Sequence, residues 1–201
     1  RRLMGKVFFR VLSWCPGALG LFLRQRLFPL YLGSCGKKVL FGRFVRLHGA
    51  RSIHIGDHSV IGDHVLLDAR RGRTGSPVIS LGAGAFVGTG SRLRSKGGKI
   101  SIGAGSSVGS YCRIVAKGSV MLEGDVLLAA FCVLGAAPSG RSAVQPATRG
   151  TDRRDNWEDI VIGTGSWLGV RSVVFPGGRV GRGTVVGAHT LVRDRLPEGA
   201  D

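Results

Sequence analysis

Aliphatic residues recur every six positions over most of the chain, and the residue after each one is often glycine. The frame is an aliphatic residue, Gly, two variable residues, a small residue and one more. Its copies are IGDHSV (55–60), IGDHVL (61–66), LGAGAF (81–86), VGTGSR (87–92), IGAGSS (102–107), VGSYCR (108–113), IGTGSW (162–167), LGVRSV (168–173), VGRGTV (180–185) and VGAHTL (186–191), with LEGDVL (122–127) and LAAFCV (128–133) as weaker ones. Repetition in phase over this length predicts a repeat architecture and not a chance run in a Gly-rich chain.

Three hexapeptides make one coil, and the leading aliphatic residues then fall into three stacks. The stacks are Ile55, Leu81, Ile102, Leu122, Ile162 and Val180; Ile61, Val87, Val108, Leu128, Leu168 and Val186; and Leu67, Leu93, Ile114, Leu134, Val174 and Val192. Each stack lines the inside of one face of a triangular prism, with coils about 4.8 Å apart, the spacing of hydrogen-bonded strands. We therefore expect a mainly β fold, a parallel β-helix of about six triangular coils.

The repeat is interrupted at four places. About eight extra residues leave the prism near 70–77, and smaller excursions fall near 94–99 and 116–121. The largest interruption predicts a protruding loop at 135–159. The β-helical domain that carries this loop spans 37–201. Long loops in compact domains are usually functional or disordered, and the position of this one in a regular solenoid favours function.

The segment 1–36 is apolar but interrupted by basic residues and by Pro16-Gly17. It predicts two short helices, because no stretch reaches the eighteen or more uncharged residues that a spanning helix needs. Amphipathic helices of this kind lie on an anionic membrane surface or cap the first coil of a solenoid. We expect membrane contact together with capping.

The net charge is +17, and the first acidic residue is Asp57. Such a basic segment attracts phosphate groups, but it is rich in aliphatic residues and Phe and holds no nucleic-acid-binding motif, so no nucleic-acid partner is expected. The four cysteines show no CxxC pair, which indicates reduced thiols in a cytoplasmic protein. Cys112 and Cys132 follow equivalent aliphatic residues by four positions and are expected inside the prism as small core residues, with no metal.

Several short motifs lie in the C-terminal coils: Trp167-Leu168-Gly169, Phe175-Pro176-Gly177, Gly187-Ala188, Leu191-Val192 and Leu196-Pro197. With the hexapeptide run they resemble the hexapeptide-repeat acyltransferases over 53–197, most closely the maltose, galactoside and lipopolysaccharide O-acetyltransferases. The segment Pro-Gly-Ala-Leu-Gly (16–20) resembles members that act on membrane-linked sugars. This resemblance implies a left-handed helix, a homotrimer with each site between two prisms, and acetyl-CoA as co-substrate in the groove between neighbours.

The resemblance also implies a His in the long loop as general base, which takes the proton of the acceptor hydroxyl as attack begins. Aligned from Leu134-Gly135, that position is Ser139, and the interval 135–159 contains no His. Serine is no base near neutral pH without a partner of its own. His189 is therefore either a displaced base or a surface residue. The CoA-binding positions implied by the family are Trp167, Val170, Ala188 and Arg193.

Two functions stay open at this point. One is an acyl-CoA-dependent O-acyltransferase that acetylates a sugar hydroxyl of a lipid-linked or cell-surface polysaccharide, peripheral on the inner face of the bacterial membrane. The other is a catalytically silent homologue that serves there as a scaffold or partner subunit. The missing His favours the second, the intact C-terminal motifs favour the first, and another protein that completes the site is compatible with both.

Overall fold

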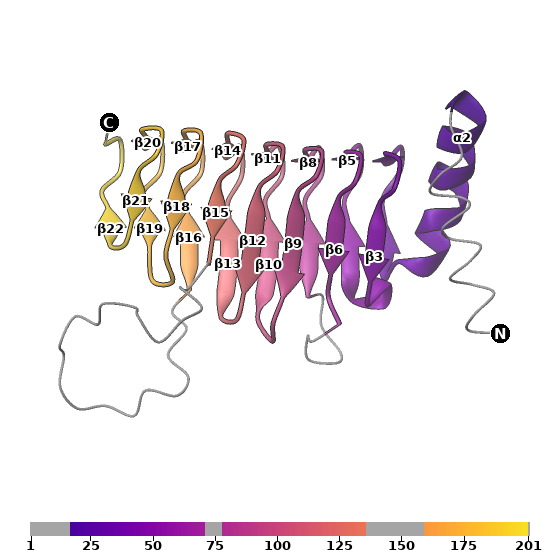
Figure 1. Cartoon of the computed structure of the whole chain (residues 1–201), viewed down its shortest axis with the longest axis horizontal. Coiled ribbons are helices and arrows are strands. Elements are labelled where there is room, and N and C mark those ends of the chain that lie inside the picture. The colour runs from indigo at the N-terminus through magenta and orange to yellow at the C-terminus, as the bar shows by residue number, and fades with distance from the viewer. Residues whose placement is uncertain (1–16, 71–77, 136–158, 201) are drawn as a thin grey trace.

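Three parallel sheets form the walls of an elongated prism in the computed structural model (Figure 1), which describes residues 17–70, 78–135 and 159–200. Sheet A contains β1 (Ser34–Cys35), β4 (Ile53–Ile55), β7 (Ile79–Leu81), β10 (Lys99–Ile102), β13 (Ser119–Leu122), β16 (Ile160–Ile162), β19 (Arg179–Val180) and β22 (Arg195–Leu196). Sheet B contains β2 (Leu40–Phe41), β5 (Val60–Ile61), β8 (Phe86–Val87), β11 (Ser107–Val108), β14 (Leu127–Leu128), β17 (Trp167–Leu168) and β20 (Val185–Val186). Sheet C contains β3 (Arg46–His48), β6 (Leu66–Asp68), β9 (Arg92–Ser95), β12 (Arg113–Ala116), β15 (Val133–Leu134), β18 (Val173–Val174) and β21 (Leu191–Val192).

The strand register confirms all three predicted stacks. Val87 pairs with Val108, and Val108 with Leu128, on successive coils of sheet B. All three side chains are fully buried. The same holds for the stacks that begin at Ile55 in sheet A and Leu67 in sheet C. The strands β1–β3 form a further coil before the first frame that the sequence pattern identified, and β22 follows the last. The apolar core is thus a column of aliphatic side chains enclosed by the three sheets.

Each frame position has a distinct task at the corner of the prism. A Cβ on Gly56 would lie 2.5 Å from the backbone N of Ala83 in the next coil, so only glycine fits there. Two residues later the backbone turns through the left-handed region, with φ 58° at His58. The buried Ser59 hydroxyl then contacts the carbonyl oxygens of Gly56 and Gly82, each at 2.9 Å. The small residue of the frame therefore fills the interior and satisfies corner carbonyl groups that would otherwise lack a partner.

Cys112 and Cys132 test this geometry. Both are buried on adjacent coils, and their thiols contact the carbonyl oxygens of Ala129 at 3.1 Å and Gly169 at 3.2 Å. They occupy the same place in the frame as the buried serines, as the sequence predicts.

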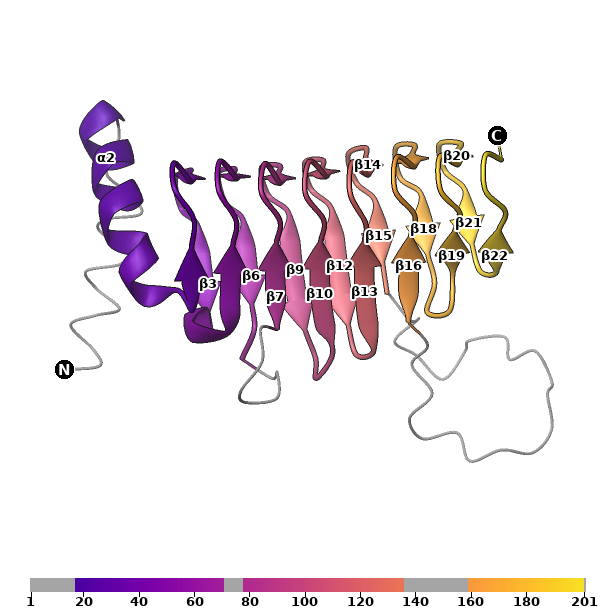
Figure 2. The ribbon, with the colours of Figure 1, turned by 180° about the vertical axis from the view of Figure 1, so that it is seen from behind.

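All four interruptions of the repeat lie between a strand of sheet C and the next strand of sheet A. At the two smaller ones, β9–β10 and β12–β13 extend by two residues and are joined by short turns, which lengthen the coils at one edge of the prism (Figure 2). The two larger ones, 71–77 and 136–158, fall outside the described residues. The four interruptions therefore share one edge of the prism, which we call the C/A edge.

Helix α2 (Gly17–Leu27) and the 3-10 turn η1 (Phe28–Tyr31) stand at the N-terminal end of the prism (Figure 1). The buried Phe28 ring packs edge-on against Phe41 of β2 at 5.1 Å, and Arg24 Nε donates a hydrogen bond of 3.0 Å to the Phe41 carbonyl oxygen. A second 3-10 turn, η2 (Ala50–Ser52), precedes β4. Among the described helices none is long and apolar enough to cross a membrane.

Candidate functional site

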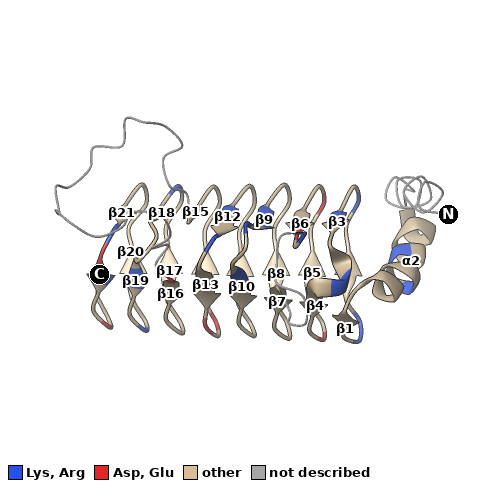
Figure 3. Ribbon diagram, turned by 90° about the horizontal axis from the view of Figure 1, so that it is seen from below, with Lys and Arg blue, Asp and Glu red and all other residues tan. Residues whose placement is uncertain are grey.

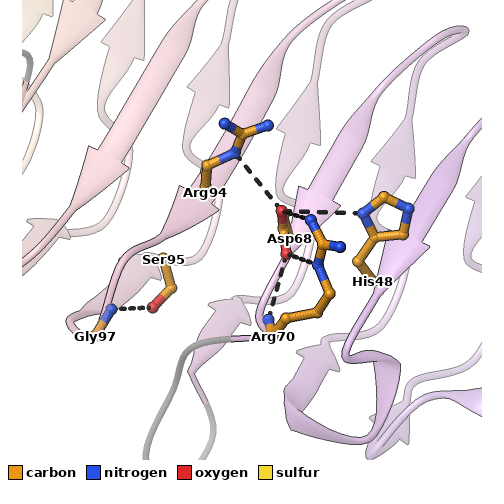
Figure 4. Close-up of polar contacts among 6 residues, drawn as sticks. All are labelled: His48, Asp68, Arg70, Arg94, Ser95 and Gly97. Atoms are coloured by element: carbon orange, nitrogen blue, oxygen red, sulfur yellow. Dashed lines mark hydrogen bonds and ion pairs between the residues drawn. The ribbon is translucent and has the colours of Figure 1, made fainter.

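A polar cluster lies on the outer face of sheet C, next to the C/A edge (Figure 4). The register places His48 beside Asp68 and Asp68 beside Arg94, on three successive coils. The Asp68 carboxylate is 4% exposed and accepts hydrogen bonds from Arg70 Nε at 2.9 Å and Arg70 Nη2 at 2.8 Å. Arg94 Nε lies 3.6 Å from the second carboxylate oxygen. A buried carboxylate is thus held between two guanidinium groups.

The electrostatics of the cluster fix the charge of both titratable groups. Hydrogen bonds from Arg70 lower the pKa of Asp68 to about 2, against the opposing effect of burial. The pKa of His48 is also lowered, first by burial and then by the positive charge of Arg70. Asp68 is therefore an anion and His48 a neutral imidazole near neutral pH.

A neutral imidazole beside a fixed carboxylate is the arrangement of a general base. His48 Nδ1 lies 3.9 Å from Asp68 Oδ2 and has no hydrogen-bond partner of its own, although it is buried. The distance exceeds a hydrogen bond, and a movement of about 1 Å brings it within range, as catalytic contacts commonly tighten when substrate binds. The His48 side chain is 39% exposed, so part of it is accessible to solvent.

An open pocket of about 480 Å³ adjoins the cluster, lined by Asp68, Arg70, Arg94, Ser95 and Lys96. Its volume falls in the range of small-molecule sites. The Ser95 hydroxyl shapes the pocket wall by donating to the Gly98 carbonyl oxygen at 2.7 Å and accepting from Gly97 N–H at 3.2 Å. The pocket thus combines a fixed carboxylate, an excess of positive charge and a turn braced by its own hydrogen bonds.

The CoA-binding positions expected from the family lie in the last coils. Trp167 is 48% exposed on the outer face of sheet B, between Leu127 and Val185 in register. Val170 and Ala188 lie at the edge between sheets B and C. There the backbone N–H of His189 donates a hydrogen bond of 2.9 Å to the Val170 carbonyl oxygen. These residues therefore share one small surface, and their assigned roles stay predictions.

The other expected positions lie elsewhere. Arg193 is near the C/A edge, where its guanidinium carbon lies 5.3 Å from the Phe175 ring centroid. Ser139 lies outside the described residues. His189, exposed with φ 60°, follows β20 of sheet B, whereas the loop that contains Ser139 leaves from β15 of sheet C. His189 therefore lies at the edge between sheets B and C, whereas β15 is followed by the C/A edge.

His48 and Asp68 were missed at the sequence level, although a signal for them exists. Each directly follows an inward aliphatic residue of sheet C, Leu47 and Leu67, so they occupy equivalent frame positions one coil apart. The frames identified from the sequence begin at Ile55. The coil that contains His48 precedes them, so its residues could not be aligned with those of the next coil.

Comparisons with known proteins bear on the fold. No model of a known protein family matches the chain. The chain is 49% identical over 39 residues, 19% of its length, to the "Putative lipopolysaccharide biosynthesis O-acetyl transferase WbbJ" of Escherichia coli (strain K12). The match spans about a fifth of that protein (20%), so it covers one short stretch of each chain.

Among solved structures, the chain is similar to AntD, an N-acyltransferase from Bacillus cereus. The complex of AntD with dTDP and 3-hydroxybutyryl-CoA superposes with a TM-score of 0.54 at 17% identity, covering 87% of this chain and 80% of AntD. A variant of AntD with dTDP-4-amino-4,6-dideoxyglucose and coenzyme A gives a TM-score of 0.53 at 18% identity, over 87% and 81%. The chain therefore shares the parallel β-helical fold of this acyltransferase.

Proposed function

We propose that the protein is an acyl-CoA-dependent O-acyltransferase that transfers an acetyl group to a sugar hydroxyl of a lipid-linked or cell-surface polysaccharide. The observation that carries the proposal is the neutral His48 beside the anionic Asp68, at a pocket on the edge where every insertion leaves the prism. The fold of AntD, which holds an acyl-CoA in its solved structure, supports the cofactor class. The short similarity to WbbJ supports a polysaccharide acceptor.

The reaction that this cluster supports is a direct transfer. His48 accepts the proton of the sugar hydroxyl as its oxygen attacks the thioester carbon. The new C–O bond forms, the C–S bond breaks, and the proton passes from the imidazolium to the departing thiolate of CoA. Asp68 stabilises the imidazolium that forms in between, and Arg70 and Arg94 hold the carboxylate in place.

The C-terminal surface fits an acyl-CoA. Trp167, Val170 and Ala188 expose apolar groups suited to the pantetheine arm, and the exposed Arg193 offers a charge for a CoA phosphate. We expect the groove to form between neighbouring left-handed prisms of a homotrimer. A mostly apolar column on the outer face of sheet B, in which Ser107 separates Phe86 from Leu127, supports such packing. Its apolar members are Leu40, Val60, Phe86, Leu127, Trp167 and Val185.

The N-terminal segment is proposed to place the enzyme on the inner face of the bacterial membrane, at the cytoplasmic side. Leu19, Phe22 and Leu30 are exposed on α2 and η1, and Arg26 lies on the same helix. Exposed apolar residues with nearby basic groups bind an anionic lipid interface. A lipid-linked acceptor would then be presented at the same surface.

Release of CoA thiol from acetyl-CoA, with crude lipid-linked glycan as acceptor, tests the proposal. His48→Gln should lower kcat by at least about 100-fold and leave the KM for acetyl-CoA unchanged, because general-base contributions are of this size. His58→Gln, an exposed corner histidine, is the matched control and should retain activity. Loss of turnover in Ser139→Ala or His189→Ala, with His48→Gln fully active, would place the base elsewhere and refute this assignment.

The absence of His from 135–159 favours the alternative, a catalytically silent homologue that acts as a membrane-associated scaffold or needs a partner protein. Calorimetry separates the two. Binding of acetyl-CoA supports the enzyme, and its absence at millimolar concentrations supports the scaffold.

A further inference from the structure

The outer face of sheet C carries three arginines in one aligned column of outward positions, next to the Asp68 cluster. Strand pairing aligns the outward positions Arg46, Leu66, Arg92 and Arg113 on four successive coils. Arg92 and Arg113 are direct partners in the register, so their strands are about 4.8 Å apart. Like charges placed directly opposite each other destabilise a sheet. An anion bound between these two exposed arginines would relieve the repulsion.

Acidic neighbours do not provide that compensation in the part of the chain that the structure describes. The ion pairs formed there all involve Asp68, with His48, Arg70 and Arg94 as its partners. Neither Arg92 nor Arg113 has a carboxylate within 4.0 Å among those residues.

The basic residues are unevenly distributed over the walls. Figure 3 shows basic residues on β3, β9 and β12 of sheet C, and sheet A carries Lys99, Arg179 and Arg195 on separate strands. The aligned outward positions of sheet B are uncharged throughout: Leu40, Val60, Phe86, Ser107, Leu127, Trp167 and Val185. Arg92 and Arg113 are directly paired arginines on adjacent coils of sheet C.

The column continues into the pocket of the candidate site. Arg94 lies two residues after Arg92 on the same side of β9, about 6.6 Å along the strand, and lines the pocket with Lys96. Arg92, Arg94 and Arg113 are therefore neighbouring positions on the outer face of sheet C, and Arg94 lines the pocket. Guanidinium groups bind phosphate oxygens through paired, charge-assisted hydrogen bonds.

We propose that Arg92, Arg94 and Arg113 bind the phosphate or diphosphate group of a phosphorylated sugar acceptor and direct its sugar toward His48. The substrate class rests on the proposed function, whereas the anion site rests on the arginines alone. Nucleic acid fits this face poorly. The nearby Tyr111 and Phe131 rings stack on each other at 5.3 Å, and Arg171 lies over Phe131 at 5.7 Å, which leaves little free ring face for a base.

Calorimetric titration with inorganic pyrophosphate at low ionic strength tests the site. We expect binding that weakens by about tenfold for each of Arg92→Gln and Arg113→Gln, in line with the loss of one hydrogen-bonded charge. Arg179→Gln is the matched control, because it removes the same charge from the outer face of sheet A. Equal weakening in all three variants, or no binding by the unaltered protein at millimolar pyrophosphate, would overturn the inference.

A stability measurement gives an independent check that needs no ligand. Arg113→Gln should raise the melting temperature of the free protein by about 1–3 °C, because it relieves the repulsion with Arg92. Pyrophosphate should raise the melting temperature of the unaltered protein and leave that of the Arg92→Gln/Arg113→Gln variant nearly unchanged. A lower melting temperature for Arg113→Gln would show that this arginine is held by protein contacts and would contradict the site.

The source of the phosphate is distinguished with vesicles. Retention on phosphatidylcholine vesicles that contain a polyprenyl diphosphate, reversed by pyrophosphate, supports a lipid-linked acceptor. Displacement of pyrophosphate by a nucleoside-diphosphate sugar, without vesicle retention, supports a soluble one. Single-stranded oligonucleotide that binds more tightly than pyrophosphate and depends on the same arginines would reassign the face to nucleic acid.

The two proposals fail separately. Pyrophosphate binding requires no acyl-CoA, so arginine-dependent binding without any acyl transfer would refute the proposed function alone. Acyl transfer with an unchanged KM for the acceptor in Arg92→Gln/Arg113→Gln would refute the phosphate site alone.

Discussion

Replacement of Asp68 by asparagine tests the central cluster through stability as well as activity. The pKa of Asp68 falls from 3.8 to about 2 in the folded protein, first through hydrogen bonds from Arg70. At 1.36 kcal/mol per pKa unit, a shift of about 1.8 units corresponds to at most about 2.4 kcal/mol of stability. The Arg70 side chain is 61% exposed, so solvent screening reduces the expected value to about 1–2 kcal/mol.

The sign of the pH dependence follows from the lowered pKa. The unfolded chain binds this proton near pH 3.8 and the folded protein only near pH 2, so the contribution is complete above about pH 4 and disappears as the pH falls toward 2. Urea unfolding of the native protein and of Asp68→Asn should therefore differ by about 1–2 kcal/mol at pH 7 and converge near pH 2. Asp194→Asn, on the exposed surface, is the control and should change stability by less than about 0.5 kcal/mol.

Two results would refute this reasoning. A difference that persists unchanged at pH 2 would show that Asp68 acts through packing or neutral hydrogen bonds. No difference at pH 7 would show that the ion pairs with Arg70 and Arg94 contribute nothing net. The same variant should lower the pKa at which His48 titrates, because the charge of Asp68 raises that pKa, whereas removal of the Arg70 charge should raise it. Histidine NMR titration would measure both shifts.

The remaining predictions concern the prism itself. Gly56→Ala should destabilise the fold by several kcal/mol, because the added Cβ would lie 2.5 Å from the backbone of the next coil. Gly165→Ala should cost only about 1 kcal/mol, because Gly165 has a φ of 71° but open space around the Cβ position. Urea unfolding of both variants measures the two free-energy changes. Leu128→Ala should cost about 3–5 kcal/mol because it opens a cavity in the fully buried stack. Leu191→Ala, an exposed leucine of sheet C, is the control and should cost less than about 1 kcal/mol in the same assay. Cys112 should resist a thiol reagent such as DTNB until the protein unfolds, since its side-chain hydrogen bond with Cys132 and burial raise its pKa; rapid labelling of native protein at pH 8, followed by peptide mapping, would contradict the burial.

The interruptions of the repeat and the candidate histidines differ in their position on the prism. All of the interruptions lie at the C/A edge, and so does the loop in which the family resemblance places a His. His189 lies at the edge between sheets B and C. His48 ends β3 of sheet C, at the C/A edge. His48 therefore lies at the edge where the repeat is interrupted, whereas His189 does not.

The amino-acid sequence by itself determined the interior of this protein. A period of six with a small residue four places after each aliphatic residue is sufficient to assign Ile55, Ile61 and Leu67 to three separate walls. The pattern predicts the core because every coil buries the same frame positions. Each frame therefore needs an aliphatic residue and a small residue at the same two places. The insertions could be located for the same reason, since each one breaks a period that resumes after it.

Only the tertiary structure decided which outward side chains contact one another. Along one column of sheet C, the partners Arg46, Leu66, Arg92 and Arg113 are separated by 20, 26 and 21 residues, because each coil carries a different excursion at the C/A edge. The predicted stack of Leu67, Leu93 and Ile114 aligns the last three of these positions, whereas Arg46 lies in the coil before the first identified frame. Periodicity aligns positions, but it does not determine which polar groups form hydrogen bonds or ion pairs. The His48–Asp68 pair and the charge state of each member arise from that lateral pairing, from burial and from the neighbouring guanidinium groups. The core thus follows from local periodicity, whereas the candidate site exists only where the coils are stacked.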